Sequence, residues 1–143
     1  MGKADKTIKK DNDRKLWNWD VVERPISYSL DDSMEENVMI DSHKAIIRTD
    51  NYDTLGVVKN SFHSIYNSSL ENIVNMLEKE GLATYHKHGT FVNGKNVWVQ
   101  LKSEMMPSLT VNDKDKTNSY ILLANGHGGA MSLRLFYYVK SMV

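Results

Sequence analysis

The chain has 143 residues, and its 18 Lys and Arg side chains balance 18 Asp and Glu side chains at a formal net charge of zero. This length suits one domain with a core of its own. The sequence contains no cysteine, which excludes disulfides and thiolate metal sites. It has no apolar run near the roughly 18 residues of a membrane span, and its charged N-terminus lacks the apolar stretch of a signal peptide. We therefore expect a cytoplasmic protein with no membrane association.

Charge is distributed unevenly along the chain. Residues 1–80 hold 11 basic and 15 acidic side chains, whereas residues 81–143 hold 7 basic and 3 acidic ones. The segments 81–103 and 116–143 contain no acidic residue. Such an asymmetry is typical either of solvated strand faces or of a surface for an anionic partner.

The first 15 residues are polar and rich in lysine, which predicts a flexible arm ahead of a single α+β domain over 16–143. In that domain, residues 19–28 alternate and favour a strand. Pro25 has no backbone N–H to donate, so we expect it at a sheet edge or a bulge.

An acidic, turn-like stretch follows over 31–41. Residues 44–49 and 54–59 read as two further strands. The polar residues 50–53 between them have turn chemistry and predict a hairpin.

One amphipathic pattern predicts the main helix, at about residues 69–80. Ser68 and Glu71 have the spacing of a capping box at its start, and Gly81 suits the left-handed position after its end. Four apolar residues recur at the helical interval and predict a face turned to the core. The residues expected to be buried are Leu70, Ile73, Val74, Leu77, Ile46, Val57 and Trp98.

Strands dominate the second half. Asn93-Gly94 predicts a tight hairpin between strands at 84–92 and 95–101. Short strands are also expected at 120–124 and 131–139, with a turn between them. We predict an α+β fold with an antiparallel sheet packed on the one main helix. Its order of three strands and a helix is similar to the β-β-β-α core of phage single-strand annealing proteins.

Several short motifs follow one another in a fixed order along the chain. They are Trp19/Val21/Arg24/Pro25, Arg48/Thr49/Asp50, Leu55/Gly56/Val57/Val58, Phe62 with Asn67, Gly89/Gly94/Trp98, and Leu122/Leu123/Asn125/His127/Gly128. In this set of motifs the chain resembles the phage- and plasmid-encoded family named domain of unknown function nine-three-two, over roughly residues 17–143. The resemblance implies a short or truncated member, in the cytoplasm of a bacterial host, and it supplies no catalytic residues.

The acid-free hairpin carries the strongest candidate site. Cations that follow phosphates and rings that stack on bases are typical of single-strand binding. By strand alternation Trp98 and Lys102 share one face, and the alternative is that Trp98 belongs to the core. The candidate nucleic-acid-binding residues are Tyr85, Lys87, Lys95, Trp98, Lys102 and Arg134.

Other chemistry is less well supported. Alternation places His86 and His88 on one side of a strand, as a metal pair would need, but no carboxylate lies near them in sequence. The glycine-rich turn at 126–129 could form a phosphate nest, yet it lacks the rest of a phosphate-binding loop. No nucleophile–base pair is recognisable. We expect no metal, no cofactor and no enzymatic activity.

The sequence therefore leaves two alternative functions open. The first is a phage or mobile-element accessory protein that binds single-stranded DNA, in the manner of an annealing protein. The alternative is an inhibitor that blocks a host defence protein, such as a CRISPR nuclease, through an acidic surface that imitates phosphates. A homo-oligomer is also left open. The candidate partner-binding residues of the inhibitor are Asp31, Asp32, Glu35 and Glu36.

Overall fold

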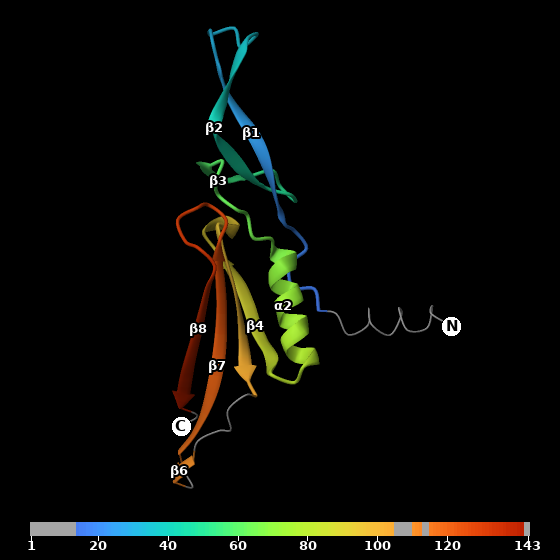
Figure 1. Cartoon of the computed structure of the whole chain (residues 1–143), viewed down its shortest axis with the longest axis vertical. Helices are drawn as coiled ribbons and strands as arrows, with labels where there is room; N and C mark the ends of the chain where they lie inside the picture. Colours follow the sequence, from blue (N-terminus) through green and yellow to red (C-terminus); the bar gives the residue numbers. More distant parts are fainter. Residues whose placement is uncertain (1–13, 105–109, 113–114, 142–143) are drawn as a thin grey trace, which may run out of the picture.

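The computed structural model describes residues 14–104, 110–112 and 115–141 as two antiparallel sheets and, within these residues, one α-helix (Figure 1). The α+β class is thereby confirmed. The first sheet has the order β1-β2-β3, and the second has the order β4-β5-β7-β6 with β8 also paired to β7. The elements are β1 (Val21–Ser29), β2 (Asn37–Arg48), β3 (Thr54–Lys59), α2 (Asn67–Lys79), β4 (Ala83–Phe91), the 3-10 turn η1 (Val92–Gly94), β5 (Asn96–Ser103), β6 (Thr110–Asn112), β7 (Asp115–Gly126) and β8 (Arg134–Ser141).

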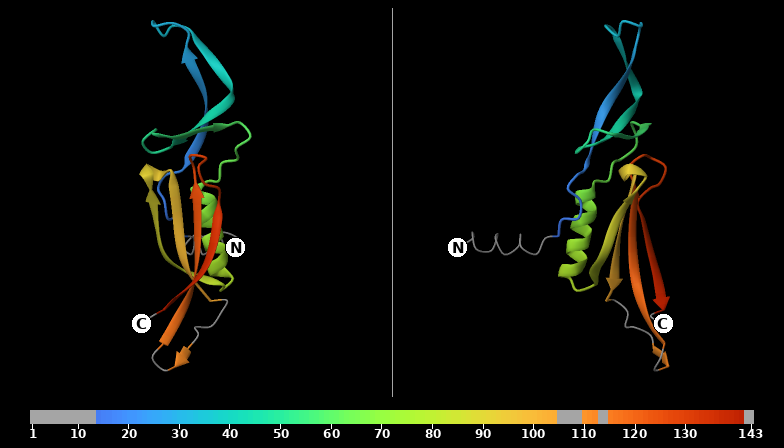
Figure 2. Two further views of the ribbon diagram at one scale, coloured as in Figure 1. Left: turned by 90° about the vertical axis from the view of Figure 1, so that its left-hand side faces the viewer. Right: turned by 180° about the vertical axis from the view of Figure 1, so that it is seen from behind.

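The two sheets lie end to end, and α2 runs along one side of the second sheet (Figures 1 and 2). The three strands before the helix thus form a sheet of their own, while the helix packs on the strands that follow it. Most of the predicted N-terminal arm, residues 1–13, lies outside the described residues. The helix in the described part of the chain is too short to cross a membrane.

The first sheet projects away from the helix as a long hairpin of β1 and β2 (Figure 1). The predicted acidic turn is shorter than expected, because β2 begins at Asn37 and pairs with the end of β1. Pro25 lies where the register of this pair shifts, opposite Lys44, while Ile26 lies opposite Ile40. Its expected place at an edge and a bulge is confirmed, since β1 is the edge strand and the pairing is interrupted there.

Helix α2 begins two residues earlier than predicted, and a side chain from outside the helix caps its N-terminus. The carboxylate of Asp20 accepts hydrogen bonds from the backbone N–H groups of Asn67, at 2.8 Å, and Ser68, at 3.1 Å. The predicted capping box is wrong, because Glu71 is buried and accepts the backbone N–H groups of Leu16 and Trp17. A distant carboxylate therefore satisfies the helix start in place of a local side chain.

The end of α2 follows the sequence prediction. Gly81 has a φ of 73°, in the left-handed region. Its backbone N–H donates to the carbonyl oxygen of Glu78 at 3.1 Å, and the backbone N–H of Leu82 donates to the carbonyl oxygen of Leu77 at 2.9 Å. These two bonds form a Schellman motif, for which glycine is the usual residue.

The core lies between α2 and the facing side of the second sheet, here named the inner face. Leu70 and Val74 of the helix are fully buried, as expected, and pack in one cluster with Val97, Val99 and Leu101 of β5. Ile46 is also buried, whereas Ile73 and Leu77 are half-buried.

Two of the expected core residues lie elsewhere. Val57 is 54% exposed, so its predicted burial is wrong. A bulge in the β2–β3 pairing interrupts the alternation, and Leu55 and Val58 turn inward instead. Trp98 is only half-buried and lies on the opposite side of the sheet from the core.

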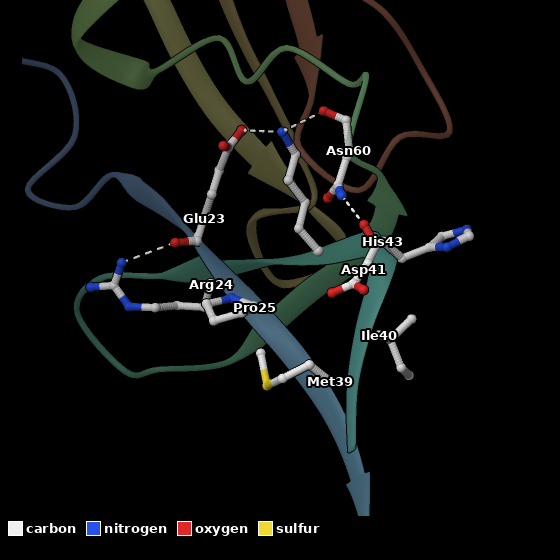
Figure 3. Close-up of a pocket in the computed structure, with 9 residues that line it drawn as sticks. Glu23, Arg24, Pro25, Met39, Ile40, Asp41, His43 and Asn60 are labelled. Atoms are coloured by element: carbon white, nitrogen blue, oxygen red, sulfur yellow. Dashed lines mark hydrogen bonds and ion pairs between the residues drawn. The ribbon is translucent and has the colours of Figure 1, made fainter. Parts of the chain in front are cut away.

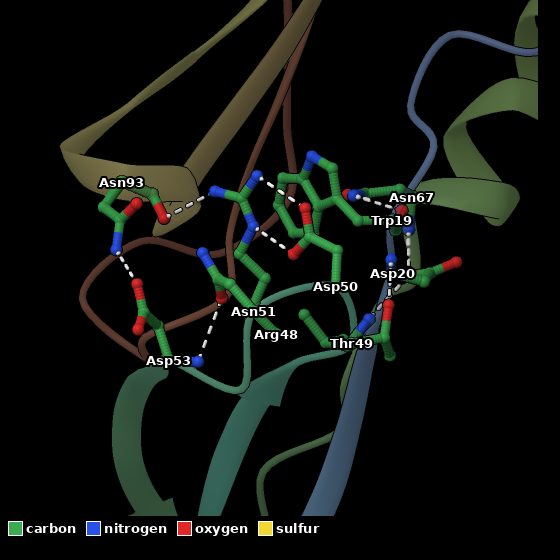
Figure 4. A network of polar contacts seen from close by, with 10 residues as sticks. Trp19, Asp20, Arg48, Thr49, Asp50, Asn51, Asp53, Asn67 and Asn93 are labelled. Atoms are coloured by element: carbon green, nitrogen blue, oxygen red, sulfur yellow. Dashed lines mark hydrogen bonds and ion pairs between the residues drawn. The ribbon is translucent and has the colours of Figure 1, made fainter.

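Trp19 joins the two sheets (Figure 4). The Arg48 guanidinium lies 4.2 Å from the centre of the Trp19 ring, and the His127 ring meets it edge-on at 5.8 Å. Arg48 also donates to the backbone oxygen of Asn93 at 3.1 Å and forms an ion pair with Asp50. These contacts fix the first sheet to the tip of the β4–β5 hairpin.

That hairpin tip differs from the predicted two-residue turn. Asn93 and Gly94 have positive φ, as a two-residue turn requires, but Val92 has positive φ as well. Phe91 pairs with Asn96, so the loop between the strands has four residues. A side chain on Gly94 would begin 2.9 Å from the Trp19 ring. The glycine is therefore required by the packing of Trp19 as well as by the turn.

Candidate nucleic-acid interface

The side of the second sheet that faces away from α2, here named the outer face, is covered by no element in the described part of the chain (Figure 2). Its side chains follow from the strand register, because residues paired directly across neighbouring strands share a face. Its three central rows are Thr84–Lys102–Tyr120–Tyr138, Lys87–Gln100–Leu122–Phe136 and Gly89–Trp98–Ala124–Arg134.

Four of the six predicted binding residues meet on this face. Lys87, Trp98 and Lys102 lie in adjacent rows of β4 and β5, and Arg134 lies at the end of the Trp98 row. Lys87, Lys102 and Arg134 are exposed. None of the residues in the three rows is acidic, so the outer face is locally basic although the chain is neutral.

The other two predicted residues lie elsewhere, and for Tyr85 the cause is a β-bulge. Tyr85 pairs with Leu101 and Lys87 pairs with Gln100, so β4 has one residue more than β5 in this stretch. Tyr85 therefore packs against the core on the inner face, with its hydroxyl 2.7 Å from Nδ1 of His88. Lys95 lies in the loop at the hairpin tip, off the outer face.

The same bulge separates the two histidines that alternation had placed together. The His86 ring lies 5.8 Å from Tyr120 of the outer face, whereas the His88 ring meets Trp17 of the core at 5.4 Å. The predicted pairing of these imidazoles on one side of the strand is wrong. Among the described residues, no group of three His, Asp or Glu side chains could hold a metal ion.

Aromatic rings form two stacked pairs on the outer face. Phe91 and Trp98 stack at 6.2 Å between ring centres, and Tyr120 and Tyr138 stack at 5.5 Å. Sequence reasoning missed both tyrosines and Phe136. The alternation of Arg134, Phe136, Tyr138 and Lys140 in one strand was the signal that could have found them.

Between the two stacked pairs lies a recess of about 420 Å³. Glycine at position 89 allows the Trp98 ring to lie across the neighbouring strand, because a side chain there would begin 2.7 Å from it. The Nε2 group of Gln100 donates to the Tyr138 hydroxyl. Burial, and secondarily Tyr120, raises the pKa of Tyr138 further above neutral than that of an ordinary tyrosine. The recess is lined by Lys87, Phe91, Asn96, Val97, Trp98, Gln100, Leu122, Ala124, Met131 and Tyr138.

A second depression, of about 330 Å³, lies at the base of the projecting hairpin (Figure 3). Its polar groups bind one another. Lys44 forms an ion pair with Glu23 at 3.0 Å and donates to Phe62 at 2.7 Å, and Asn60 donates to the backbone oxygen of Asp41. Hydrogen bonds from Ser64 and Lys44 lower the pKa of Glu23. This network stabilises the β-bulge, and it leaves few polar groups in the depression free to bind a ligand.

The glycine-rich turn at 126–129 packs against the first sheet, and its last two residues line a depression of about 350 Å³ together with residues of β3. His127 is buried, and its backbone N–H donates to the carbonyl oxygen of Lys95 at 2.6 Å. A side chain on Gly56 of β3 would begin 2.6 Å from the Cα atom of Gly128. The close approach of the two backbones accounts for glycine at positions 56 and 128.

The four acidic candidates lie together at the tip of the β1–β2 hairpin. Asp31, Asp32, Glu35 and Glu36 are all exposed. Their loop is closed by a 2.8 Å hydrogen bond from the Leu30 N–H to the Glu36 oxygen. Apolar side chains lie exposed in the same hairpin, namely Tyr28, Leu30, Met34 and Met39.

The fold and the outer face define the class of protein, an α+β protein whose helix-backed antiparallel sheet presents an aromatic and basic surface. Among known families, the model of the Domain of unknown function (DUF932) matches residues 54–139. The chain belongs to this family. The comparisons with curated proteins and with solved structures give no match. The matched range begins with β3, so the β1–β2 hairpin precedes it.

Proposed function

We propose that the outer face binds single-stranded nucleic acid without catalysis. The observation that carries the proposal is the joint placement of two stacked aromatic pairs and three exposed cations on one uncovered sheet face. Aromatic rings on a sheet stack on unpaired bases, and cations around them follow the phosphates.

The charge distribution supports this choice of partner. The acidic surplus of residues 1–80 includes the tip of the β1–β2 hairpin, at the far end of the first sheet from the outer face (Figure 1). The outer face itself combines Lys87, Lys102 and Arg134 with no acid in the central rows. A local field of one sign attracts a polyanion even where the whole chain is neutral.

Replacing Trp98 with alanine is expected to weaken binding of a fluorescent single-stranded oligonucleotide by about 1–3 kcal/mol, because the ring on which a base stacks is lost. Fluorescence anisotropy at low salt measures the effect. Tyr52→Ala is the matched control, since Tyr52 is an aromatic residue 81% exposed in the turn between β2 and β3. Absence of binding by the wild-type protein at concentrations on the order of tens of micromolar would refute the proposal.

The salt dependence provides an independent check. Replacing Lys87 or Lys102 with glutamine is expected to reduce the slope of log affinity against log salt by about 0.7 each. A slope that is unchanged in both variants would exclude phosphate contacts at these lysines.

A second candidate function rests on the β1–β2 hairpin. Its tip carries four exposed acids beside exposed apolar side chains, including Met34 at 72% exposure. Acids arranged on a projecting element could occupy a basic groove built for nucleic acid in a host defence protein, such as a CRISPR nuclease, while the apolar side chains add contact area.

Replacing Asp31, Asp32, Glu35 and Glu36 together with serine is expected to abolish co-purification with such a nuclease and to leave oligonucleotide binding unchanged. The two readouts separate the candidate functions, because the hairpin tip and the outer face lie in different sheets. Equal capture of the nuclease by the wild-type and substituted proteins would exclude the acidic mimic.

Under either function the protein acts in the cytoplasm of a bacterial host as an accessory of a phage or mobile element. A second copy of the chain is a further candidate partner. Strand β8 supports this, because it pairs only with β7 within the described residues and exposes Leu135, Tyr137 and Val139. Light scattering of the free protein measures this self-association.

A further inference from the structure

Two polar atoms on the outer face are shielded from water without a partner. The indole Nε1 of Trp98 and the Oε1 atom of Gln100 are both enclosed, and neither makes a hydrogen bond within the described part of the chain. Gln100 is 9% exposed, and its amide nitrogen Nε2 donates a hydrogen bond to the Tyr138 hydroxyl. A buried donor or acceptor without a partner is costly and calls for an explanation.

Both side chains line the 420 Å³ recess between the stacked aromatic pairs. Leu122 and Ala124 form its apolar floor in the same rows of the sheet. An apolar recess with a few convergent polar groups is typical of a small-molecule site. The flanking rings suit a flat heterocycle, which gains stacking as well as hydrogen bonds.

The register places three polar side chains next to one another. Gln100 lies directly across from Lys87 and two residues along β5 from Trp98. Two neighbouring residues that line the recess can therefore donate beside its free acceptor, Lys87 from across the sheet and Trp98 from along the strand. A ligand edge that pairs with all three groups offers one donor flanked by two acceptors.

Among the nucleobases, thymine and uracil carry such an edge, as an imide N–H flanked by two carbonyls. We infer that the recess binds one thymine or uracil base of the bound strand, with Gln100 accepting the imide N–H and with Trp98 and Lys87 donating to the carbonyls. This inference rests on the proposed single-strand binding. Adenine and guanine lack the acceptor–donor–acceptor edge, and cytosine presents two neighbouring acceptors.

The test compares affinities for oligo(dT), oligo(U), oligo(dA) and oligo(dC) of one length and at one salt concentration. The wild-type protein is expected to bind the dT and U strands about tenfold more tightly than the dA and dC strands, the discrimination typical of a well-paired base edge. The dT and U arms separate a DNA ligand from an RNA ligand that shares the imide edge.

Gln100→Leu removes the central acceptor and is expected to abolish the preference by weakening dT and U binding about tenfold. Trp98→Phe keeps a ring but removes the N–H, and it is expected to reduce the preference as well. Lys102→Gln is the matched control, because Lys102 lies on the outer face but not in the recess. It should weaken all four strands alike and leave the preference unchanged.

Equal affinity of the wild-type protein for all four strands would overturn the inference, while salt-dependent binding would still support the proposed function. A preference that persists in both Gln100→Leu and Trp98→Phe would also overturn it. If no strand binds even at low salt, both the inference and the proposed function fail. Circular dichroism confirms that each variant is folded before its affinities are compared.

Discussion

Replacing Trp19 with alanine is expected to lower the free energy of unfolding by about 3–5 kcal/mol, the range for removing a large buried aromatic side chain. Trp19 is 7% exposed and lies between the Arg48 guanidinium and the His127 ring. It also fills the space above Gly94 at the hairpin tip. Its loss therefore removes packing from both sheets at once. Urea denaturation followed by circular dichroism measures the change.

Tyr52→Ala is the control for this substitution. Tyr52 is 81% exposed in the turn between β2 and β3, and its loss should change the stability by less than about 0.5 kcal/mol. If Trp19→Ala costs less than about 1 kcal/mol, the two sheets are not held together through this side chain.

Acidification is expected to destabilise the protein through His127. This side chain is 1% exposed, and burial lowers its pKa from 6.5 to about 4, although the charge of Asp20 opposes the shift. Its Nε2–H group donates to the side-chain oxygen of Asn67, whose amide donates to the Trp19 carbonyl oxygen. The folded protein thus holds a neutral imidazole at the joint between the sheets.

The sign follows from the protons bound in each state. Between pH 6.5 and 4 the unfolded chain protonates His127 and the folded chain does not, so stability is complete above pH 6.5 and falls as the pH is lowered. At pH 5 the loss relative to pH 8 is about 2 kcal/mol, from 1.36 kcal/mol per pH unit. Urea midpoints measured across this range test the prediction.

His127→Gln keeps a side-chain donor but cannot titrate. This variant should be less stable at pH 8 and lose about 2 kcal/mol less than the wild-type protein on acidification to pH 5. A carboxylate with a lowered pKa, such as Glu23, loses its contribution only at more acidic pH. Parallel pH profiles for the two proteins would show that the buried histidine is not the source of the acid sensitivity.

Local patterns determined most of the secondary structure. The apolar stripe of α2 and Gly81 after its end define the helix and its C-terminal cap within a few residues along the chain. Asn93-Gly94 marks the β4–β5 hairpin in the same way, since few other residues adopt positive φ. These features depend on neighbours in sequence, and the sequence therefore predicts them.

The candidate site was predicted in part. Alternation from Trp98 to Lys102 along β5 placed both on one face, because β5 has no irregularity between them. For Tyr85 and the histidine pair the same reasoning was wrong, since one bulged residue reverses every later side chain. A bulge is decided by the partner strand, which local sequence does not reveal.

The tertiary structure alone decided how the elements meet. Asp20 caps α2 from 47 positions away, and Glu71 satisfies the backbone of Leu16 from 55 positions away. The pairing of β7 with β8 is what brings Tyr138 beside Tyr120 and Gln100 and so builds the aromatic face. The sequence by itself determined an α+β chain with one amphipathic helix and a basic, aromatic hairpin. Long-range strand register decided which rings, cations and unpaired polar atoms share a surface. The reason is that backbone pairing, and not spacing along the chain, sets the side-chain partners across a sheet.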